Sequence, residues 1–139
     1  MEEPTAADVK PNPGPGPGAK RKLLLVEDDR PTSNALRGIL SLRGWEVTVA
    51  TTVREGVEAV GRERFSAVVV DLMLPDGDGE AVLDELRRRV EGSESAVRTV
   101  VATGVSDRGR IEAVSRRGGV AALLRKPIQL SDLMRAIGK

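Results

Sequence analysis

The sequence of 139 residues contains no cysteine and no histidine, and these two absences exclude several kinds of chemistry. Without cysteine there are no disulfides and no thiolate metal ligands. Without histidine the chain has no Ser-His-Asp triad, no histidine-bound zinc and no phosphohistidine of its own. Tyrosine is also absent, and Trp45 and Phe65 are the only aromatic residues, so stacking on nucleic-acid bases is almost excluded.

The charged residues are balanced in sign but uneven in type. Lys and Arg total 22 against 21 Asp and Glu, and a net charge of +1 argues against electrostatic binding to nucleic acid or a membrane surface. Arginine accounts for 17 of the basic residues, and Lys126 is the only lysine between Leu23 and Gly138. Chemistry within the domain therefore depends on carboxylates, hydroxyls, the backbone and one ammonium group.

The first twenty residues differ in composition from the rest of the chain. They hold five of the eight prolines, with strict Pro-Gly alternation over 13–18, which predicts a disordered tail or linker. The remaining residues, 21–139, suit a single domain. Because no apolar run approaches the roughly 20 residues of a membrane span and no signal-peptide pattern is evident, we expect a cytoplasmic protein.

From residue 22 onward, short apolar runs alternate with segments of helical periodicity. Continuous, β-branched runs are typical of strands buried on both faces of a parallel sheet. The alternation therefore predicts an α/β fold, with a parallel sheet covered by helices on both faces. The expected strands are 23–26, 47–50, 67–70, 97–102 and 120–124, and the expected helices are 31–43, 52–60, 81–90, 111–117 and 131–137.

The first helical segment carries a specific packing prediction. Its apolar residues recur with a period close to 3.6, so we expect one stripe of them to face the core. That stripe consists of Ala35, Leu36, Ile39, Leu40 and Leu42.

Acidic residues, a hydroxyl and the single lysine stand where the expected strands end. Glu27 and Asp28 follow the first strand, and Asp71 follows the third. Thr103 ends the fourth strand, and Lys126 follows the fifth. Because the carboxyl ends of parallel strands form one ligand-binding edge, neighbouring strands would bring these side chains together.

Closely packed carboxylates raise one another's pKa unless their charge is compensated. A hard divalent cation such as Mg²⁺, held by oxygen ligands, would compensate it, and Lys126 could pair with one carboxylate. Solvated loop acids are the plainer interpretation. The apolar runs directly before Glu27, Asp28 and Asp71 argue against it.

Three other acids have a simpler interpretation. Asp29 is placed to start the helix that follows the first strand. Asp76 and Asp78, within the sequence Pro-Asp-Gly-Asp-Gly at 75–79, are typical of a turn and a helix entry.

The residue types at the strand ends suit phosphoryl transfer to a carboxylate. Aspartate can act as a nucleophile toward phosphorus, and Asp71 is the candidate because it follows the most apolar strand. Mg²⁺ and Lys126 would neutralise the phosphoryl oxygens, and Thr103 would donate a hydrogen bond to one of them. A compact ammonium explains why a chain rich in arginine uses lysine at this position.

Four motifs in this order resemble the receiver domain of two-component response regulators. They are Val-Glu-Asp-Asp at 26–29, Val-Asp-Leu-Met-Leu-Pro-Asp-Gly-Asp-Gly at 70–79, Ala-Thr-Gly at 102–104 and Arg-Lys-Pro at 125–127. The resemblance covers residues 22–139. It implies a flavodoxin-like (βα)5 fold with a doubly wound, five-stranded parallel sheet in the order 2-1-3-4-5.

The resemblance also implies a metal site and a phosphoryl acceptor. Asp71 would take a phosphoryl group from a phosphohistidine on a sensor histidine kinase or histidine phosphotransfer protein. Asp28 and Asp71 would bind Mg²⁺ directly, Glu27 would bind it through water, and the backbone carbonyl of Met73 would be a further ligand.

The same resemblance assigns the remaining residues of the site. Thr103 and Lys126 would contact the phosphoryl group, and Gly104 would leave room for the donor. A receiver catalyses its own phosphorylation and dephosphorylation without being a conventional enzyme. It would signal by binding a downstream protein partner, with no role for nucleic acid or membrane within this chain.

Leu123 stands where receivers usually carry Tyr or Phe, so the output signal would differ from the usual aromatic switch. A pseudo-receiver that binds a partner without phosphorylation is therefore an alternative, although the intact Asp71, Thr103 and Lys126 argue against it. An enzyme on the same fold is a second alternative. Few aromatics argue against a flavin protein, and Asp71-Leu72-Met73 lacks the Asp-x-Asp pair of a phosphatase. The sequence leaves open whether the domain stands alone or belongs to a hybrid kinase.

Overall fold

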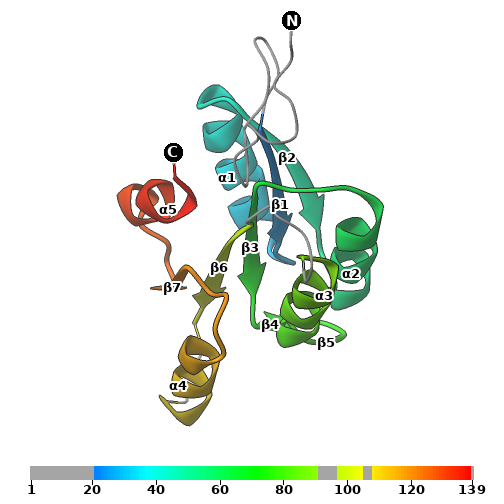
Figure 1. The fold of residues 1–139 in the computed structure, drawn as a ribbon. Helices are drawn as coiled ribbons and strands as arrows, with labels where there is room; N and C mark the ends of the chain where they lie inside the picture. Colours follow the sequence, from blue (N-terminus) through cyan, green and yellow to red (C-terminus); the bar gives the residue numbers. More distant parts are fainter. Residues whose placement is uncertain (1–20, 91–96, 105–107, 139) are drawn as a thin grey trace, which may run out of the picture.

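A five-stranded parallel sheet forms the centre of the computed structural model, which describes residues 21–90, 97–104 and 108–138 (Figure 1). The predicted tail at 1–20 lies outside these residues. The strands of the sheet are β1 (Arg21–Val26), β2 (Trp45–Ala50), β3 (Ala67–Asp71), β6 (Arg98–Thr103) and β7 (Ala122–Arg125). Their spatial order is β2-β1-β3-β6-β7, with every neighbouring pair parallel. Counted along the chain within this sheet, that is the expected order 2-1-3-4-5.

Helices cover both faces of the sheet, as the alternation of strands and helices predicts. They are α1 (Arg30–Leu42), α2 (Val53–Arg62), α3 (Glu80–Val90), α4 (Arg108–Arg116) and α5 (Leu130–Ile137). Side chains of α2, α3 and α4 share one apolar core, and those of α1 and α5 share the other. In Figure 1, α2 and α3 lie together on one side of the sheet. The fold class is therefore the predicted doubly wound α/β sheet.

The two cores are separated by alternate residues of the central strands. Leu24 and Val26 of β1 point into the core beneath α2 and α3, whereas Leu23 and Leu25 point into the core beneath α1 and α5. All of them are buried, because β1 and β3 have neighbours on both edges and helices on both faces. This burial explains why both strands are continuous apolar runs.

The predicted apolar stripe of α1 is only partly buried. Leu36 and Leu40 pack into the core, but Ala35 and Ile39 are exposed, and Leu42 is 89% exposed. Leu36 and Leu40 are four positions apart and lie one above the other on the helix. The other three residues form an adjoining flank, so the stripe was predicted too wide.

A small hairpin follows β3, where the sequence indicated a turn. It consists of β4 (Met73–Leu74) paired antiparallel with β5 (Gly77–Asp78), apart from the main sheet. The hairpin leads through Gly79 into α3. A Cβ atom at Gly79 would lie 2.0 Å from the backbone oxygen of Asp71, so only glycine fits this approach.

The helices in the described part of the chain are eight to thirteen residues long. None of them is both long enough and apolar enough to cross a bilayer.

Candidate functional site

The register of the sheet brings three strand ends together. Val26 at the end of β1 pairs with Val70 in β3, so the next residues, Glu27 and Asp71, stand side by side. Asp71 in turn pairs with Ala102, the residue before Thr103 in β6. Glu27, Asp71 and Thr103 therefore stand at one edge of the sheet because parallel strands in this order all end there.

Three carboxylates form a cluster at this edge. Glu27, Asp28 and Asp71 each offer an oxygen atom, and these oxygens lie within 4.8 Å of one another. Glu27 is only 2% exposed and Asp71 only 6%, whereas Asp28 is exposed. The cluster thus combines two buried carboxylates with one that faces solvent.

Lys126 lies between the two buried carboxylates. Its Nζ donates to Oε1 of Glu27 at 2.7 Å and to Oδ2 of Asp71 at 2.8 Å. Burial by itself lowers the pKa of Lys126, but the hydrogen bonds to Asp71 and Glu27, together with their charges, outweigh burial and raise the pKa. Lys126 is therefore a cation at neutral pH. The peptide bond between Lys126 and Pro127 is cis.

Backbone N–H groups hold the other oxygen of each buried carboxylate. Oδ1 of Asp71 accepts from the N–H of Met73 at 3.0 Å, and Oε2 of Glu27 accepts from the N–H of Asp29 at 3.0 Å. Both side chains are therefore oriented by protein groups on two sides.

Thr103 and Gly104 complete the edge at the end of β6. Thr103 is fully buried, and its backbone oxygen accepts from the N–H of Lys126 at 3.0 Å. A Cβ atom at Gly104 would lie 4.0 Å from Cβ of Lys126. The structure thus places the predicted hydroxyl residue, glycine and lysine next to one another.

The donor set of this edge fits a hard cation. Three carboxylates meet with one ammonium, which leaves negative charge that an oxygen-binding ion such as Mg²⁺ would balance. Met73, on the hairpin after Asp71, exposes 62% of its surface, and its backbone belongs to the loop beside the cluster. The arrangement suits holding a divalent ion beside a nucleophilic carboxylate.

Asp29 has the helix-starting role that the sequence suggests. It is the N-cap of α1, and its side chain accepts hydrogen bonds from the backbone N–H and the hydroxyl of Thr32. The bond from the Thr32 hydroxyl, followed by the one from the Thr32 N–H, lowers the pKa of Asp29. Asp29 thus organises the helix that begins beside the cluster.

Asp78 has the helix-entry role that the sequence suggests, because it accepts from the first N–H group of α3, but Asp76 and Asp78 also make contacts with distant residues. Asp76 accepts from the backbone N–H groups of Val53 and Arg54, at the start of α2. Asp78 accepts from the N–H of Glu80 and forms an ion pair with Arg110 of α4 at 2.6 Å.

The sequence did not indicate a role for Arg110. In the structure, its Nη2 also donates to the backbone oxygen of Leu72 at 3.2 Å. Leu72 and Arg110 are 38 positions apart, so local patterns carry no signal for this contact.

Leu123 lies on the side of the sheet that α4 covers. It is half-buried against the core that contains Val101 and Val114, and it pairs in register with Val101. Leu123 thus packs on the same face of the sheet as Val114 of α4.

Comparison with known proteins agrees with this geometry. A sequence model described as "response regulator receiver domain" matches residues 23–138. Among curated proteins, the chain is 39% identical over 112 residues to the transcriptional activator protein PfeR of Pseudomonas aeruginosa, covering 81% of this chain and 35% of PfeR. It is 34% identical over 118 residues to the response regulator protein FleR of the same species, covering 85% of this chain and 24% of FleR. The chain thus spans about a third or less of these two relatives.

Solved structures give the same family. A CheY-like response regulator receiver domain protein from Methanospirillum hungatei superposes with a TM-score of 0.76 and 27% identity, covering 86% of this chain and 92% of that one. The receiver domain of a sensor histidine kinase from Pseudomonas aeruginosa superposes with a TM-score of 0.72 and 27% identity, covering 87% of this chain and all of that one. In that crystal structure a magnesium ion is coordinated in the active site cleft.

Proposed function

The chain belongs to the response regulator receiver family, and from that membership we propose that Asp71 accepts a phosphoryl group from a phosphohistidine on a partner protein. The observation that carries the proposal is the buried Asp71 carboxylate, which lies in the acidic cluster and within 2.8 Å of Lys126. Because the 139 residues contain no histidine, the phosphohistidine lies outside them, and the proposed donor is a sensor histidine kinase or a histidine phosphotransfer protein.

In the proposed reaction an oxygen of Asp71 attacks phosphorus and forms a new P–O bond. The P–N bond to the donor imidazole breaks, and the ring nitrogen leaves with the electron pair and takes a proton from solvent. Lys126 stays beside the acceptor, where its ammonium balances negative charge on the phosphoryl oxygens. The hydroxyl of Thr103, at the end of the neighbouring strand, would donate to one of those oxygens.

The proposed metal ion is Mg²⁺, held by Asp28 and Asp71 directly, by Glu27 through water and by the backbone carbonyl of Met73. When bound, it supplies positive charge to the phosphoryl oxygens. The oxygen-only donor set of the cluster supports this choice, because Mg²⁺ typically takes one or two carboxylates and keeps water or phosphate oxygens.

The proposed output is the binding of a downstream protein partner once Asp71 is phosphorylated. The domain would catalyse its own phosphorylation and the later hydrolysis of the aspartyl phosphate, without acting on a separate substrate as a conventional enzyme does. A cytoplasmic location belongs to the same proposal. No feature of the described residues favours a module that binds its partner without phosphorylation.

Intact-mass measurement with acetyl phosphate tests the proposed acceptor. The wild-type chain is expected to gain the mass of one phosphoryl group when Mg²⁺ is present and to gain none when the metal is chelated. Asp71→Asn is expected to gain none under either condition. Equal labelling of wild type and Asp71→Asn would rule out Asp71 as the acceptor.

A further inference from the structure

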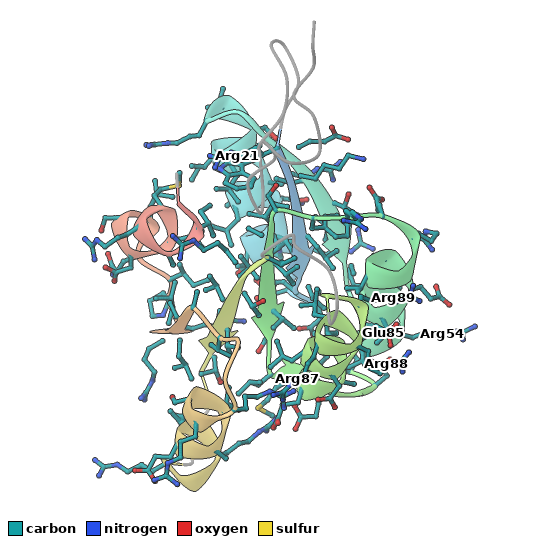
Figure 2. The ribbon with its side chains drawn as sticks, in the orientation of Figure 1. Arg21, Arg54, Glu85, Arg87, Arg88 and Arg89 are labelled. Carbon is teal, nitrogen blue, oxygen red and sulfur yellow. The ribbon has the colours of Figure 1, made fainter. Side chains whose placement is uncertain are left out.

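Asp76, at the tip of the hairpin, connects the hairpin to the start of α2. Its Oδ1 accepts from the N–H of Val53 at 2.7 Å, and its Oδ2 accepts from the N–H of Arg54 at 3.1 Å. The bond from Arg54 uses its backbone, and Figure 2 shows the Arg54 side chain extending away from α2 toward solvent. Asp76 therefore recognises the start of the helix itself.

The start of α2 needs this second acceptor. The first N–H groups of a helix have no partner within the helix, and a carboxylate placed there also meets the positive end of the helix dipole. The side chain of Thr52, the local N-cap, accepts from the N–H of Glu55, and the backbone oxygen of Thr52 accepts from the N–H of Gly56. Asp76 accepts from the N–H groups of Val53 and Arg54, which come before Glu55 in the helix. Thr52 and Asp76 therefore bind different N–H groups of the first turn.

The hairpin itself has little support from apolar packing. It pairs only two residues with two, and such a short hairpin is marginally stable alone. Leu74 is its buried side chain, whereas Met73, Gly77 and Asp78 are exposed. The hairpin therefore depends on contacts with the rest of the molecule for its position.

Helix α2 packs against the end of β1, the strand that Glu27 and Asp28 follow. A Cβ atom at Gly56 would lie 3.2 Å from Cγ2 of Val26 and 3.0 Å from Cγ2 of Val82, so the helix backbone packs tightly against β1 and α3. Val26 directly precedes Glu27. One helix thus touches the end of β1 and, through Asp76, also binds the hairpin that carries Met73.

We propose that Asp76 is a positioning residue for the metal site, because it fixes the hairpin carrying the Met73 carbonyl relative to the β1 end carrying Glu27 and Asp28. This inference rests on the proposed Mg²⁺ site. Asp76 touches neither the ion nor the phosphoryl group, so it acts through the backbone that it holds. Groups that orient metal ligands typically change metal affinity by about 10- to 100-fold when they are removed.

The experiment measures the Mg²⁺ dissociation constant of the full chain by calorimetric titration, alongside its thermal unfolding. Asp76→Ala is expected to weaken Mg²⁺ binding by about tenfold, at the lower end of the range for orienting groups. Asp76→Asn, which keeps one acceptor oxygen, should fall between Asp76→Ala and wild type. Thr52→Ala is the matched control, because it removes a bond from the same helix start and none from the hairpin.

Two further measurements show whether Asp76 acts by positioning the hairpin, by its charge or by stabilising α2. Repeating the titration at about 0.5 M KCl screens the long-range effect of the lost carboxylate, and the affinity loss of Asp76→Ala should persist. In the metal-free protein, amide hydrogen exchange of Met73 should accelerate in Asp76→Ala and not in Thr52→Ala. Asp76→Asn also serves if Asp76→Ala does not fold.

Three results would overturn the inference. An unchanged Mg²⁺ affinity in Asp76→Ala and Asp76→Asn would show that Asp76 is only a helix cap. An equal loss in Thr52→Ala would assign the effect to the stability of α2. If the wild-type chain showed no Mg²⁺ binding, the proposed metal site would be wrong, and so would the inference that rests on it.

Discussion

The centre of the sheet and its β7 edge are stabilised in different ways. Strands β1 and β3 are buried on both faces, whereas every described residue of β7 is half-buried or exposed. Helix α4, beside that edge, buries only Val114. Polar contacts also attach it to the preceding elements: ion pairs from Arg110 to Asp78 and from the adjacent Arg117 to Glu80 and Asp84, and a hydrogen bond from Arg110 to the backbone oxygen of Leu72.

Helices α2 and α3, near the centre of the sheet, combine an apolar core with ion pairs. Glu85 of α3 is buried and pairs with Arg88 and Arg89, and Arg89 approaches α2 so closely that a Cβ atom at Gly61 would lie 3.0 Å from its Nη2. Figure 2 shows Glu85 and Arg89 on the side of α3 nearest α2. Ion pairs there supplement an apolar core, while at α4 they replace much of it.

This difference corresponds to the two parts of the proposed function, phosphoryl acceptance and output. Glu27 follows β1 and Asp71 ends β3, so each is attached to a strand that packing holds on both faces. Helix α4 has few buried apolar contacts, and such elements open at lower free energy than core strands. If the proposed output involves a change in shape on phosphorylation, α4 is the helix whose movement packing opposes least.

The largest expected difference concerns apolar truncation. Leu24→Ala in β1 should lower the free energy of unfolding by about 2–5 kcal/mol, because it leaves a cavity in a fully buried core. Ile111→Ala in α4, where the side chain is half-buried, should cost about 1 kcal/mol. Urea unfolding measures both. Equal losses would show that α4 is packed as firmly as the centre.

The next largest effect concerns Gly79, which packs closely against the backbone of the proposed acceptor, Asp71. Gly79→Ala would put a Cβ atom 2.0 Å from the Asp71 backbone oxygen, so the backbone must shift. We expect a loss of about 1–3 kcal/mol of unfolding free energy and impaired phosphoryl uptake.

Gly38→Ala in α1 is the control for Gly79→Ala, because its Cβ would meet nothing within 4 Å. It should stabilise the protein by about 0.5–1 kcal/mol through helix propensity. A Gly79→Ala protein with wild-type stability and uptake would contradict the tight packing at the acceptor.

The alkaline pH dependence should come largely from Lys126. Its pKa is raised in the folded state, so its contribution to stability is complete below the ordinary lysine pKa of 10.5 and is lost as pH rises through the raised value. The chain has no tyrosine or cysteine to titrate in that range.

Thermal unfolding measured from about pH 9 to pH 12 should therefore show a decline that is shallower in Lys126→Met than in wild type. Lys22→Met is the comparison, since Lys22 pairs with Glu63 at the surface. Parallel pH profiles for wild type and Lys126→Met would remove the predicted role of Lys126.

The smallest effect concerns the ion pairs of α4. Arg117→Gln removes the pairs that reach across to Glu80 and Asp84, and should lower stability by about 0.2–1 kcal/mol while amide exchange in α4 accelerates. Arg116→Gln, which loses only a pair to Glu112 within α4, should have a weaker effect. Equal exchange in the two variants would argue against an ionic attachment of α4 to α3.

The strand ends could be predicted from the sequence because their chemistry follows from topology. Apolar runs before Glu27 and Asp71 mark buried strands, and parallel strands in the same sheet end at one edge. The family resemblance then supplied the strand order, which the structure confirms. The cluster of Glu27, Asp28 and Asp71 is therefore found where the sequence placed it.

Contacts between distant polar side chains could not be predicted in the same way. Asp76 lies 23 positions from Val53, and the turn-forming sequence around Asp76 already explained its presence. The prediction for the buried stripe on α1 was too wide for a related reason. Periodicity shows which side of the helix is apolar, but not how much of that side the sheet covers. Ile39 and Leu42 depend on that coverage.

The most direct test of the central claim is transfer from a phosphorylated histidine phosphotransfer protein to this chain, followed with radiolabelled phosphate. We expect the label to leave the donor and appear on the wild-type chain only when Mg²⁺ is present, and never on Asp71→Asn. Asp71→Asn should still fold, which thermal unfolding would check. Transfer of label to Asp71→Asn, or equal transfer to wild type after metal chelation, would contradict a magnesium-dependent acceptor at Asp71.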